Sequence, residues 1–419
     1  MTSSGFFHDI LSSVFDKRFT LRRIADERPI EELCRELLTS RGEVSASRLG
    51  QLVLDRFDTL DEEGQHQFFC FLTDELDLQT EEVASAAKSY EEERTSENFE
   101  KLMQAAEPLR QVLLRRLNQV PNATVRLVRM REALLKLSKK DSSLKRTDVD
   151  FQHLFASWFN RGFLVLRRID WQSPAQILQK IIQYEAVHEI DDWDDLQRRV
   201  HPEDRHCYAF FHPSMPDEPL IFVEVALCDS VPASVQEILS DNRDVLEQEL
   251  ANTAVFYSIS NCQKGLAGIS FGNSLIKQVV QDLKAELPEI STFITLSPLP
   301  RFNRWLEEND LLSEEHTDDE LKVLAARYLH EPKDRNGNPL DPVAKFHLNN
   351  GAIIHQLHAN ADISAKGKQQ SSGVMVNYLY DLKSVEQNHE EYAERQNIVV
   401  SKAISNLLAK SKTKQKAGA

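Results

Sequence analysis

The sequence predicts a two-domain protein, with an all-α N-terminal helical domain followed by an α/β (α+β) domain. The chain has 419 residues, which is long for a single hydrophobic core. Up to about residue 158, apolar residues recur at helical spacing and glycine is scarce. From Asn160-Arg161-Gly162 onward, short β-branched and aromatic runs alternate with helical segments. We therefore place a helical domain at residues 1–158 and a mixed domain at residues 159–419.

The first half is predicted to form helices joined by short polar loops. Leu109, Leu113 and Leu117, for example, lie on one apolar stripe, as expected of a helix packed on a core. No catalytic constellation occurs in this half, so packing or self-association is its expected role. Residues 1–157 are predicted to be helical almost throughout, and examples of the helices are Ile30–Leu38, Ala46–Asp58, Glu63–Glu75, Thr80–Glu93, Ser96–Gln119 and Ala123–Leu137.

The second half mixes strands and helices. The predicted strands are Cys207–Phe211, Leu220–Leu227, Ala254–Ser260, Thr292–Leu296, Ile353–His358 and Val374–Tyr380. The predicted helices are Pro174–Tyr184, Val231–Leu239, Arg301–Glu308, Asp319–Tyr328, Pro342–Leu348 and Ala393–Ala409. After the last helix, four lysines alternate with other residues, and we expect a disordered basic tail there: Lys410, Lys412, Lys414 and Lys416.

Residues 254–300 contain a strand, a glycine-rich loop, a helix and a second strand. The helix is expected to start at Asn273 and to end before Pro288. A right-handed crossover would make the two strands parallel neighbours. Ser297 would then lie at the carboxyl edge of the sheet, where α/β sheets bind their ligands.

The glycine-rich loop is a candidate anion site. It matches neither the P-loop nor the G-x-G-x-x-G pattern. Glycines between a strand and a helix N-terminus nevertheless leave backbone N–H groups and the helix dipole facing an anion, and Lys264 adds charge. A pyrophosphate group would suit such a loop. A tight turn with no ligand is an equally good interpretation of the glycines alone.

His347 is a candidate partner of Ser297, although spacing alone does not establish that they meet. Asp341-Pro342 is typical of a helix start and Asn350-Gly351 of a helix end, so His347 falls in the last turn. The helix C-terminus would favour the protonated imidazole. A solvent-exposed His347 is the alternative.

The remaining candidate residues give weaker evidence of a functional site. Glu224 lies in an otherwise apolar strand, and it is either a base with a shifted pKa or a structural carboxylate with a charged partner. Cys262 is interpreted as a small residue at a strand end rather than a nucleophile. We expect reduced thiols and no metal site, because the cysteines show no ligand spacing and several histidines do not occur in the carboxylate or cysteine patterns that metal sites usually show: His201, His206, His212, His355 and His358.

Composition excludes some partners. The chain has 50 basic and 66 acidic residues, a net charge of −16, which argues against nucleic-acid binding. No apolar run approaches the roughly 20 residues of a spanning helix. The apolar N-terminus is interrupted by Asp9 and Asp16 and lacks the features of a secretory signal, so an ordinary first helix is expected. An organellar transit peptide is the alternative, because Arg18, Arg22 and Arg23 follow. We therefore expect a cytoplasmic protein with no membrane partner.

Seven segments together resemble the malonyl-CoA decarboxylase family, and the resemblance extends over most of the chain. The resemblance implies a helical N-terminal domain and a catalytic domain similar to acetyl-CoA-dependent N-acetyltransferases (GNAT-type). The segments are NRGFL at 160–164, HPSMPDEPLIFVEVAL at 212–227, FYSIS at 256–260, GLAGISFGNSLIKQVV at 265–280, TLSPLPRF at 295–302, LDPVAKFHLNNGA at 340–352 and GVMVNYLYDL at 373–382.

The resemblance also implies an activity and a site. A carboxy-lyase would convert malonyl-CoA into acetyl-CoA and CO2 without metal or organic cofactor, CoA being part of the substrate. Ser297 and His347 match the family's catalytic serine and histidine, facing the malonyl group, and Ser258 and Tyr380 match supporting positions. The loop implied to bind the CoA phosphates contains Gly265, Ala267, Gly268, Ile269, Ser270, Phe271, Gly272 and Asn273.

One departure and two alternatives accompany this interpretation. Ser270 stands where some family members have a glutamate, so a role of that carboxylate in orienting the histidine is in doubt. An acetyl-CoA-dependent N-acyltransferase, with Glu224 as base, would share the phosphate loop, and a non-catalytic CoA-binding scaffold would use the helical half.

The expected partners are malonyl-CoA and acetyl-CoA, and further copies of the chain in a homo-oligomer (dimer or tetramer) formed through the helical domain.

Overall fold

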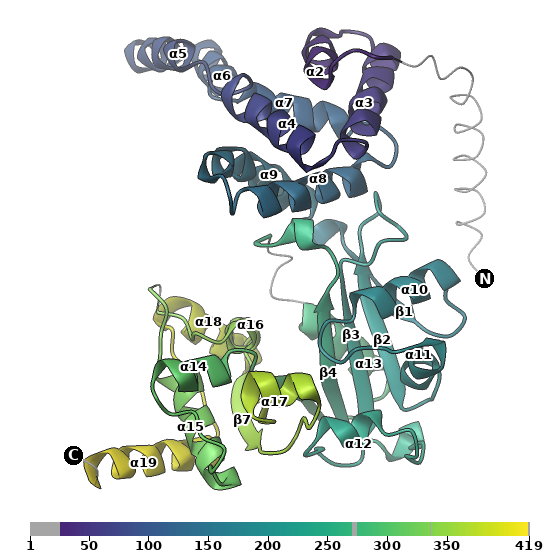
Figure 1. Cartoon of the computed structure of the whole chain (residues 1–419), viewed down its shortest axis with the longest axis vertical. Coiled ribbons are helices and arrows are strands. Elements are labelled where there is room, and N and C mark those ends of the chain that lie inside the picture. Colours follow the sequence, from purple (N-terminus) through teal and green to yellow (C-terminus); the bar gives the residue numbers. More distant parts are fainter. Residues whose placement is uncertain (1–25, 270–274, 336, 418–419) are drawn as a thin grey trace. The chain divides into compact units, whose positions relative to one another are not determined.

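The computed structural model describes residues 26–269, 275–335 and 337–417. The chain divides into two compact units, one ending at Leu154 and the other beginning at Phe155 (Figure 1). The first unit is helical and the second contains a mixed sheet, so the predicted order of fold classes is confirmed.

Amphipathic helices build the first unit around a core that includes Leu54, Phe68 and Leu134. Asp61 caps α4 by accepting a hydrogen bond from the Gly64 N–H (2.8 Å). The elements are α2 Ile30–Thr39, α3 Glu43–Asp58, α4 Glu62–Asp74, α5 Thr80–Glu92, α6 Ser96–Ala105, α7 Leu109–Leu117, α8 Ala123–Leu137, η1 Ser142–Leu144 and α9 Lys145–Trp158.

One expectation for this unit was wrong. Ser96–Gln119 is not one helix, because Pro108 lacks an N–H and disfavours helical backbone at the residue before it, so α6 and α7 are separate. Helix α9 lies in the part expected to be almost entirely helical, although its bounds were not predicted. Its Asp148 forms a buried ion pair with Arg131 of α8 (2.7 Å), and tertiary pairing of this kind leaves only a weak hydrophobic pattern in the sequence.

The second unit contains strands, short helices and 3-10 turns. The strands are β1 Val165–Ile169, β2 Arg205–Phe211, β3 Ile221–Cys228, β4 Thr253–Asn261, β5 Thr292–Thr295, β6 Ser297–Pro298, β7 Ile353–His358 and β8 Met375–Leu379. The helices and turns are η2 Arg161–Phe163, α10 Ala175–Tyr184, α11 Trp193–Val200, α12 Val235–Leu239, η3 Gln248–Leu250, η4 Lys264–Leu266, α13 Leu275–Glu286, α14 Phe302–Glu308, α15 Asp318–His330, α16 Pro342–Asn349, α17 Ala365–Ser371, α18 Val385–Arg395 and α19 Lys402–Ala417.

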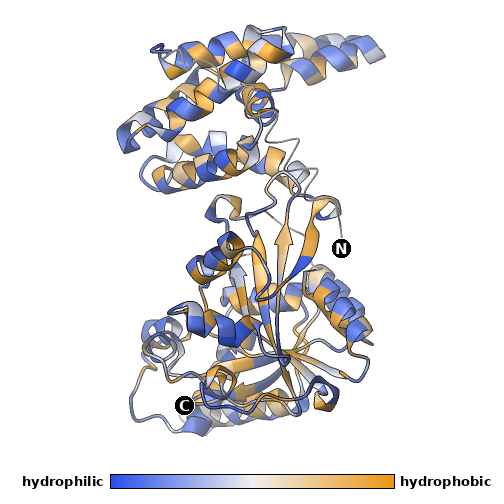
Figure 2. Cartoon of the chain, turned by 90° about the vertical axis from the view of Figure 1, so that its right-hand side faces the viewer, coloured by the Kyte–Doolittle hydropathy of each residue, from blue (hydrophilic) through white to orange (hydrophobic). Residues whose placement is uncertain are grey.

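Within the described residues, eight strands form one sheet in the order β1-β2-β3-β4-β5-β8-β6, with β7 also paired to β8. Strands β1 to β4 are antiparallel, whereas β4 and β5 are parallel, with Thr253 opposite Thr292. This parallel pair confirms the predicted strand–helix–strand unit. Figure 2 shows the strands as largely hydrophobic and the helices as two-sided, as expected of a sheet covered by amphipathic helices.

Two further expectations were wrong in the second unit. Strand β1 was missed because its sequence, VLRRI, carries two arginines. The C-terminal segment forms α18 and α19 rather than one helix, and α19 continues through the four lysines expected to be disordered. Helix α19 packs against α15 and β7 and buries Ile404, so tertiary packing stabilises this helix.

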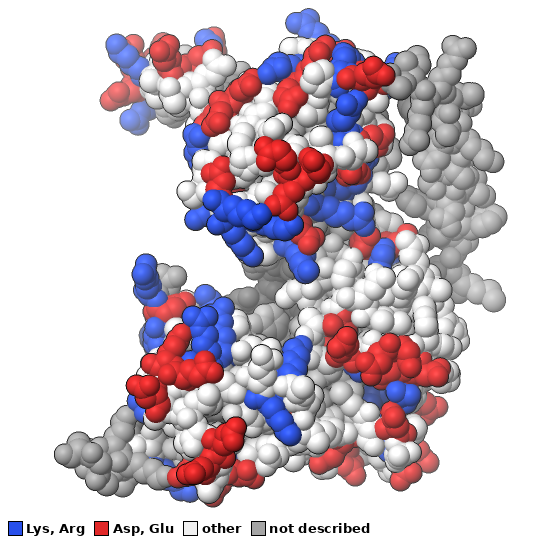
Figure 3. Space-filling model, viewed as in Figure 1, with Lys and Arg blue, Asp and Glu red and all other residues white. Residues whose placement is uncertain are grey.

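The charge and hydropathy of the described residues can be stated directly. Both acidic and basic side chains lie on the face seen in Figure 3. Among the residues that the structure describes, no helix has the length and apolar character needed to cross a membrane.

Candidate active site

Ser297 lies where the central part of the sheet ends. Strand β5 ends at Thr295, and Ser297 begins the short strand β6, opposite Val376 of β8. Pro298 favours extended backbone at the preceding residue, which helps to hold Ser297 in this strand. Ser297 therefore lies just beyond the carboxyl end of β5, the position expected from the sequence.

Helix α16 positions His347. Asp341 is the N-cap and accepts hydrogen bonds from the N–H groups of Val343 and Ala344, both at 2.9 Å. The helix ends at Asn349, so His347 lies in its last turn as predicted. Asp341 also accepts a hydrogen bond from the Tyr328 hydroxyl (3.0 Å), which anchors the start of the helix to α15.

Ser297, His347 and Tyr380 form one hydrogen-bonded group. The Ser297 Oγ is 3.2 Å from the His347 Nε2, and the His347 Nδ1 is 2.8 Å from the Tyr380 hydroxyl. The imidazole stacks on Tyr378, with ring centroids 4.4 Å apart. The structure thus brings together three residues that are separated by up to 83 positions in the sequence, including both implied catalytic residues.

The group is buried, and this changes the expected charge of His347. The exposed fractions of Ser297 and His347 are 5% and 2%. Burial lowers the pKa of His347 to about 3, so the imidazole is neutral at physiological pH. The expectation of a helix-stabilised imidazolium was therefore wrong, because desolvation outweighs the helix C-terminus. The alternative of an exposed His347 was wrong too.

The hydrogen-bond directions assign a tautomer to the neutral imidazole. The Ser297 hydroxyl donates to the Thr295 Oγ1 (2.9 Å), which leaves the serine oxygen as an acceptor for His347. The Nε2 then carries the proton, and the Nδ1 accepts from the Tyr380 hydroxyl. One directed chain runs from Tyr380 through His347 and Ser297 to Thr295.

Replacing Tyr380 by phenylalanine should lower turnover by about 10- to 100-fold, with a much smaller change in KM. The variant leaves the buried Nδ1 without its donor, so the reactive tautomer and the ring orientation are held less firmly. We expect the free energy of unfolding to fall by only about 1–3 kcal/mol. Steady-state kinetics and urea denaturation measure the two effects.

The matched control is Tyr392→Phe, which removes another buried hydroxyl of the second unit, bonded to Asn338 at 3.4 Å. This variant should keep wild-type turnover. Equal turnover losses in the two variants would contradict a positioning role for Tyr380.

Ser258, the second implied supporting residue, makes its contacts elsewhere. Its Oγ lies 2.8 and 2.7 Å from the two carboxylate oxygens of Glu185, at the end of α10. Glu185 also accepts the backbone N–H groups of Val187 (2.7 Å) and His188 (2.8 Å). Ser258 is thus tied to the segment that follows α10, and its hydroxyl is held by a carboxylate.

The glycine-rich loop is described in part. Gly265 lies in η4, Ala267 and Ile269 follow it, and Gly268 adopts a φ of +79°, a conformation that favours glycine. An added Cβ on Gly268 would meet no atom within 4 Å, so the glycine is required by backbone conformation rather than by crowding. Four predicted phosphate-binding residues lie outside the described residues: Ser270, Phe271, Gly272 and Asn273.

Two of the weaker candidates are fully enclosed. Glu224 has no exposed surface, its Oε2 lies 3.5 Å from the Arg199 Nη1, and burial raises its pKa to about 8. Cys262 is buried, and burial raises the pKa of its thiol well above the usual range, as suits a structural residue. The described cysteines are all free, in agreement with the expected reduced thiols.

Acid should destabilise the second unit through its buried neutral histidines. The pKa of His206 is lowered by burial to about 4, below its usual 6.5. The unfolded chain therefore binds more protons than the folded chain at acid pH. The contribution of the neutral His206 to the free energy of unfolding is fully present above about pH 6.5 and is lost as the pH falls toward 4. Replacing His206 by glutamine should reduce the loss of stability between about pH 7 and pH 4.5 by about 2 kcal/mol.

The measurement is urea denaturation followed by tryptophan fluorescence. The division between the units falls within α9, after Leu154, so its last residue and the other tryptophans all belong to the second unit: Trp158, Trp171, Trp193 and Trp305. Burial raises the pKa of Glu224 and of Asp341, which acts with the opposite sign. The test is therefore the difference between variant and wild type, in which those contributions cancel. An identical pH dependence in the two proteins would contradict a buried neutral His206.

Sequence reasoning missed three residues of this region: Thr295, Tyr378 and Glu185. A signal existed for two of them, because Thr295 and Tyr378 lie two positions before Ser297 and Tyr380 and so share their faces of the strands. Glu185 offered no such signal. It lies 73 positions before Ser258, and only the tertiary structure joins them.

Family models match most of the chain. The model described as "Malonyl-CoA decarboxylase C-terminal domain" matches residues 162–318 and 307–418. The model described as "Malonyl-CoA decarboxylase N-terminal domain" matches residues 77–159. The two matches correspond to the sheet-containing and the helical parts of the chain.

The chain is also similar to individual proteins. It is 36% identical over 305 residues to a mitochondrial malonyl-CoA decarboxylase of Anser anser anser, covering 62% of this chain and 60% of the relative. It is 35% identical over 310 residues to the Rattus norvegicus protein of the same description, covering 63% of each. The chain thus spans about 60% of the length of these curated relatives.

Solved structures show similarity over more of the chain. A crystal structure of malonyl-CoA decarboxylase from Rhodopseudomonas palustris has a TM-score of 0.85 at 46% identity, covering 90% of this chain and 98% of the other. The structure from Agrobacterium vitis has a TM-score of 0.84 at 45% identity, covering 90% and 99%.

Proposed function

The chain belongs to the malonyl-CoA decarboxylase family, and on that premise we propose that it is a carboxy-lyase that converts malonyl-CoA into acetyl-CoA and CO2. The observation that carries the proposal is the buried group of Ser297, His347 and Tyr380, which places a hydroxyl and an imidazole within 3.2 Å of each other at the sheet edge. The reaction needs a polar pair of this kind in a site that excludes water.

The chemistry requires no metal or organic cofactor. The bond between the carboxylate carbon and C2 of the malonyl group breaks, and its electron pair moves onto the thioester carbonyl to form an enolate. CO2 leaves, and a proton adds to C2 to give acetyl-CoA. The protein must bind the carboxylate, stabilise the enolate oxygen and deliver the proton. We assign substrate orientation to Ser297 and proton delivery to His347.

The neutral state of His347 suggests how the proton is supplied. In the substrate-free chain, the pKa of His347 is about 3. A malonyl carboxylate bound beside the ring would favour the charged imidazolium and raise that pKa. The imidazolium would then hold the proton until C2 needs it. NMR of labelled histidine should show a neutral His347 at about pH 6.5 in the free protein and a protonated ring with sulfoacetyl-CoA bound, since this analogue cannot release CO2. A ring that stays neutral in that complex would exclude this route.

The rest of the substrate would lie along the glycine-rich loop. We propose that residues 265–273 bind the CoA phosphates, with Gly268 supplying the backbone conformation that lets the loop turn. Ser258 and Tyr380 would act as supporting residues, Ser258 through Glu185 and Tyr380 through His347. The residues 159–419 would then form the catalytic acyl-CoA-binding domain.

Incubation of the purified chain with malonyl-CoA alone tests the proposal. The expected products are CO2 and acetyl-CoA in equal amounts, with no acceptor present. Acetyl transfer to an amine without CO2 release would instead indicate an N-acyltransferase. Glu224, the base of that alternative, has no exposed surface and pairs with Arg199, which gives an amine no path to its carboxylate. Tight CoA binding without turnover would indicate a scaffold.

The remaining partners follow from the same assignment. We propose that residues 1–158 serve packing and self-association in a homo-oligomer, a dimer or tetramer, which light scattering coupled to size-exclusion chromatography would measure. We also propose a cytoplasmic location with no nucleic-acid or membrane partner. The relatives from Anser anser anser and Rattus norvegicus are described as mitochondrial, so fractionation of the source cells is the relevant test.

A further inference from the structure

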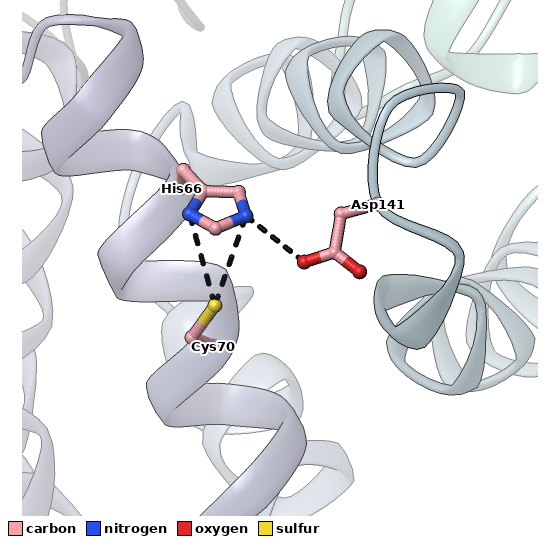
Figure 4. A group of neighbouring side chains, drawn as sticks. All are labelled: His66, Cys70 and Asp141. Carbon is pink, nitrogen blue, oxygen red and sulfur yellow. Dashed lines mark hydrogen bonds and ion pairs between the residues drawn. The ribbon is translucent and has the colours of Figure 1, made fainter.

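A histidine, a cysteine and an aspartate meet in the helical unit (Figure 4). His66 and Cys70 lie on α4, and Asp141 lies between α8 and the short helix η1. One potential ligand atom from each residue lies within 4.8 Å of the others. The residues of the candidate active site belong to the other unit.

Local structure places the three side chains. His66 and Cys70 are four residues apart on one helix, which puts them on the same face. Asp141 is the N-cap of η1: its Oδ1 accepts hydrogen bonds from the backbone N–H (2.9 Å) and the hydroxyl (2.7 Å) of Ser143. This capping leaves the Oδ2 facing His66. The carboxylate is therefore oriented by contacts outside the group, as metal ligands commonly are through the hydrogen bonds of their other atoms.

The distances suit a small tetrahedral ion. The His66 Nε2 is 3.0 Å from the Asp141 Oδ2 and 3.9 Å from the Cys70 Sγ. Bond lengths of zinc to N, O and S place neighbouring ligand atoms about 3.4 Å apart for N and O and about 3.6 Å apart for pairs with sulfur. The three atoms now lie within 4.8 Å of one another, so metal binding would have to draw them closer together. We propose that His66, Cys70 and Asp141 bind one zinc-like divalent ion per chain.

The donor set selects the class of metal. An imidazole nitrogen and a thiolate are poor ligands for Mg²⁺ or Ca²⁺, which take oxygen ligands, but good ligands for zinc and cobalt. Cysteine binds a metal ion as the thiolate, so the Cys70 thiol must lose its proton. Metal binding must therefore release this proton, and the affinity should rise with pH.

The site would act as a clamp with an open position. The side chains of His66 and Asp141 are 33% and 32% exposed, so a fourth ligand, water or a donor from another molecule, has access. The ion would join α4 to the segment after α8, beside the ion pairs that Glu62 makes with Lys136 (2.9 Å) and Lys140 (2.6 Å). Binding should then raise the thermal stability of the helical unit and slow hydrogen exchange in α4.

Titration of the full chain with Co²⁺ tests the proposal. The protein is purified reduced, stripped with a chelator and freed of any histidine tag. The expected result is one equivalent of bound cobalt, with a thiolate-to-cobalt charge-transfer band and the visible bands of tetrahedral cobalt, all removed by added Zn²⁺. Affinity for Zn²⁺ should fall as the pH is lowered from about 8 to about 6.

Variants separate a built site from surface binding. Cys70→Ser should abolish the charge-transfer band, and Asp141→Asn should weaken binding by more than the roughly 10- to 100-fold expected for loss of an outer-shell partner such as Ser143. Cys228→Ser and His201→Gln, which lie in the other unit, should bind as the wild type does. Binding that lacks the band, that survives Cys70→Ser, or that does not occur at micromolar metal would overturn the proposal and leave a plain His–Asp ion pair.

Discussion

Replacing His347 by glutamine should lower the rate of CO2 release from malonyl-CoA by at least about 100-fold while the chain stays folded. Glutamine fills much of the imidazole volume and keeps hydrogen-bonding capacity, but it cannot hold and deliver a proton. Ser297→Ala should cause a comparable loss, because it removes the group that orients the reacting end of the substrate. Steady-state kinetics with malonyl-CoA, together with tryptophan fluorescence of the folded state, measure both effects.

The double variant adds a sharper test. The Ser297 Oγ and His347 Nε2 are 3.2 Å apart, so the two residues should act as one unit. The effects of the two substitutions on turnover should therefore be far from additive. We expect the double variant to be about as slow as the slower single variant. The controls are His201→Gln and Ser291→Ala, which change exposed residues of the same unit and should keep wild-type rates. If either single variant kept near-full activity while folded, the assignment of Ser297 and His347 would be wrong.

Replacing Arg131 by methionine should destabilise the helical unit by about 3–5 kcal/mol. Arg131 of α8 is 1% exposed, and its Nε lies 2.7 Å from the Asp148 carboxylate on α9. Methionine retains much of the volume of the arginine stem but leaves a buried carboxylate without its partner. Hydrogen exchange in α8 and α9 of the full chain, measured with increasing urea, reports this loss directly.

A second substitution should restore part of this stability. In Arg131→Met/Asp148→Leu, both charges are replaced by apolar groups, so the penalty of an unpaired buried carboxylate disappears. The matched control is Lys101→Met, which breaks an exposed pair with Glu97 whose side chains are 59% and 76% exposed, and it should cost less than about 1 kcal/mol. An Arg131→Met chain within 1 kcal/mol of wild type would contradict this account of α8 and α9.

Several features of the fold follow from the sequence by local physics. Helix α8 and strand β7 have the predicted bounds, because their apolar periodicity is regular and their ends carry clear signals. The parallel pairing of β4 and β5 followed from the handedness of the crossover between them. Asp341-Pro342 was enough to locate the start of α16, and with it the turn that carries His347.

Features that depend on distant contacts were not predictable in this way. A long helical pattern across Pro108 hid the break between α6 and α7, and the two arginines of β1 hid a strand. Helix α19 packs against α15 and β7, and these contacts were not evident from the alternating lysines at its end. The absence of a metal site was inferred from the spacing of cysteines and histidines, which does not reveal that Asp141 lies beside His66.

The candidate active site shows the same division. By itself, the sequence determined which residues stand at the sheet edge and in the last turn of a helix, and its motifs indicated the family, because strand ends, helix caps and motif order are local properties. Only the tertiary structure decided that Ser297, His347 and Tyr380 touch, that Ser258 is held by Glu185, and that His347 is neutral. The charge of a histidine depends on the dielectric and the partners around it, and those come from residues far away in the chain.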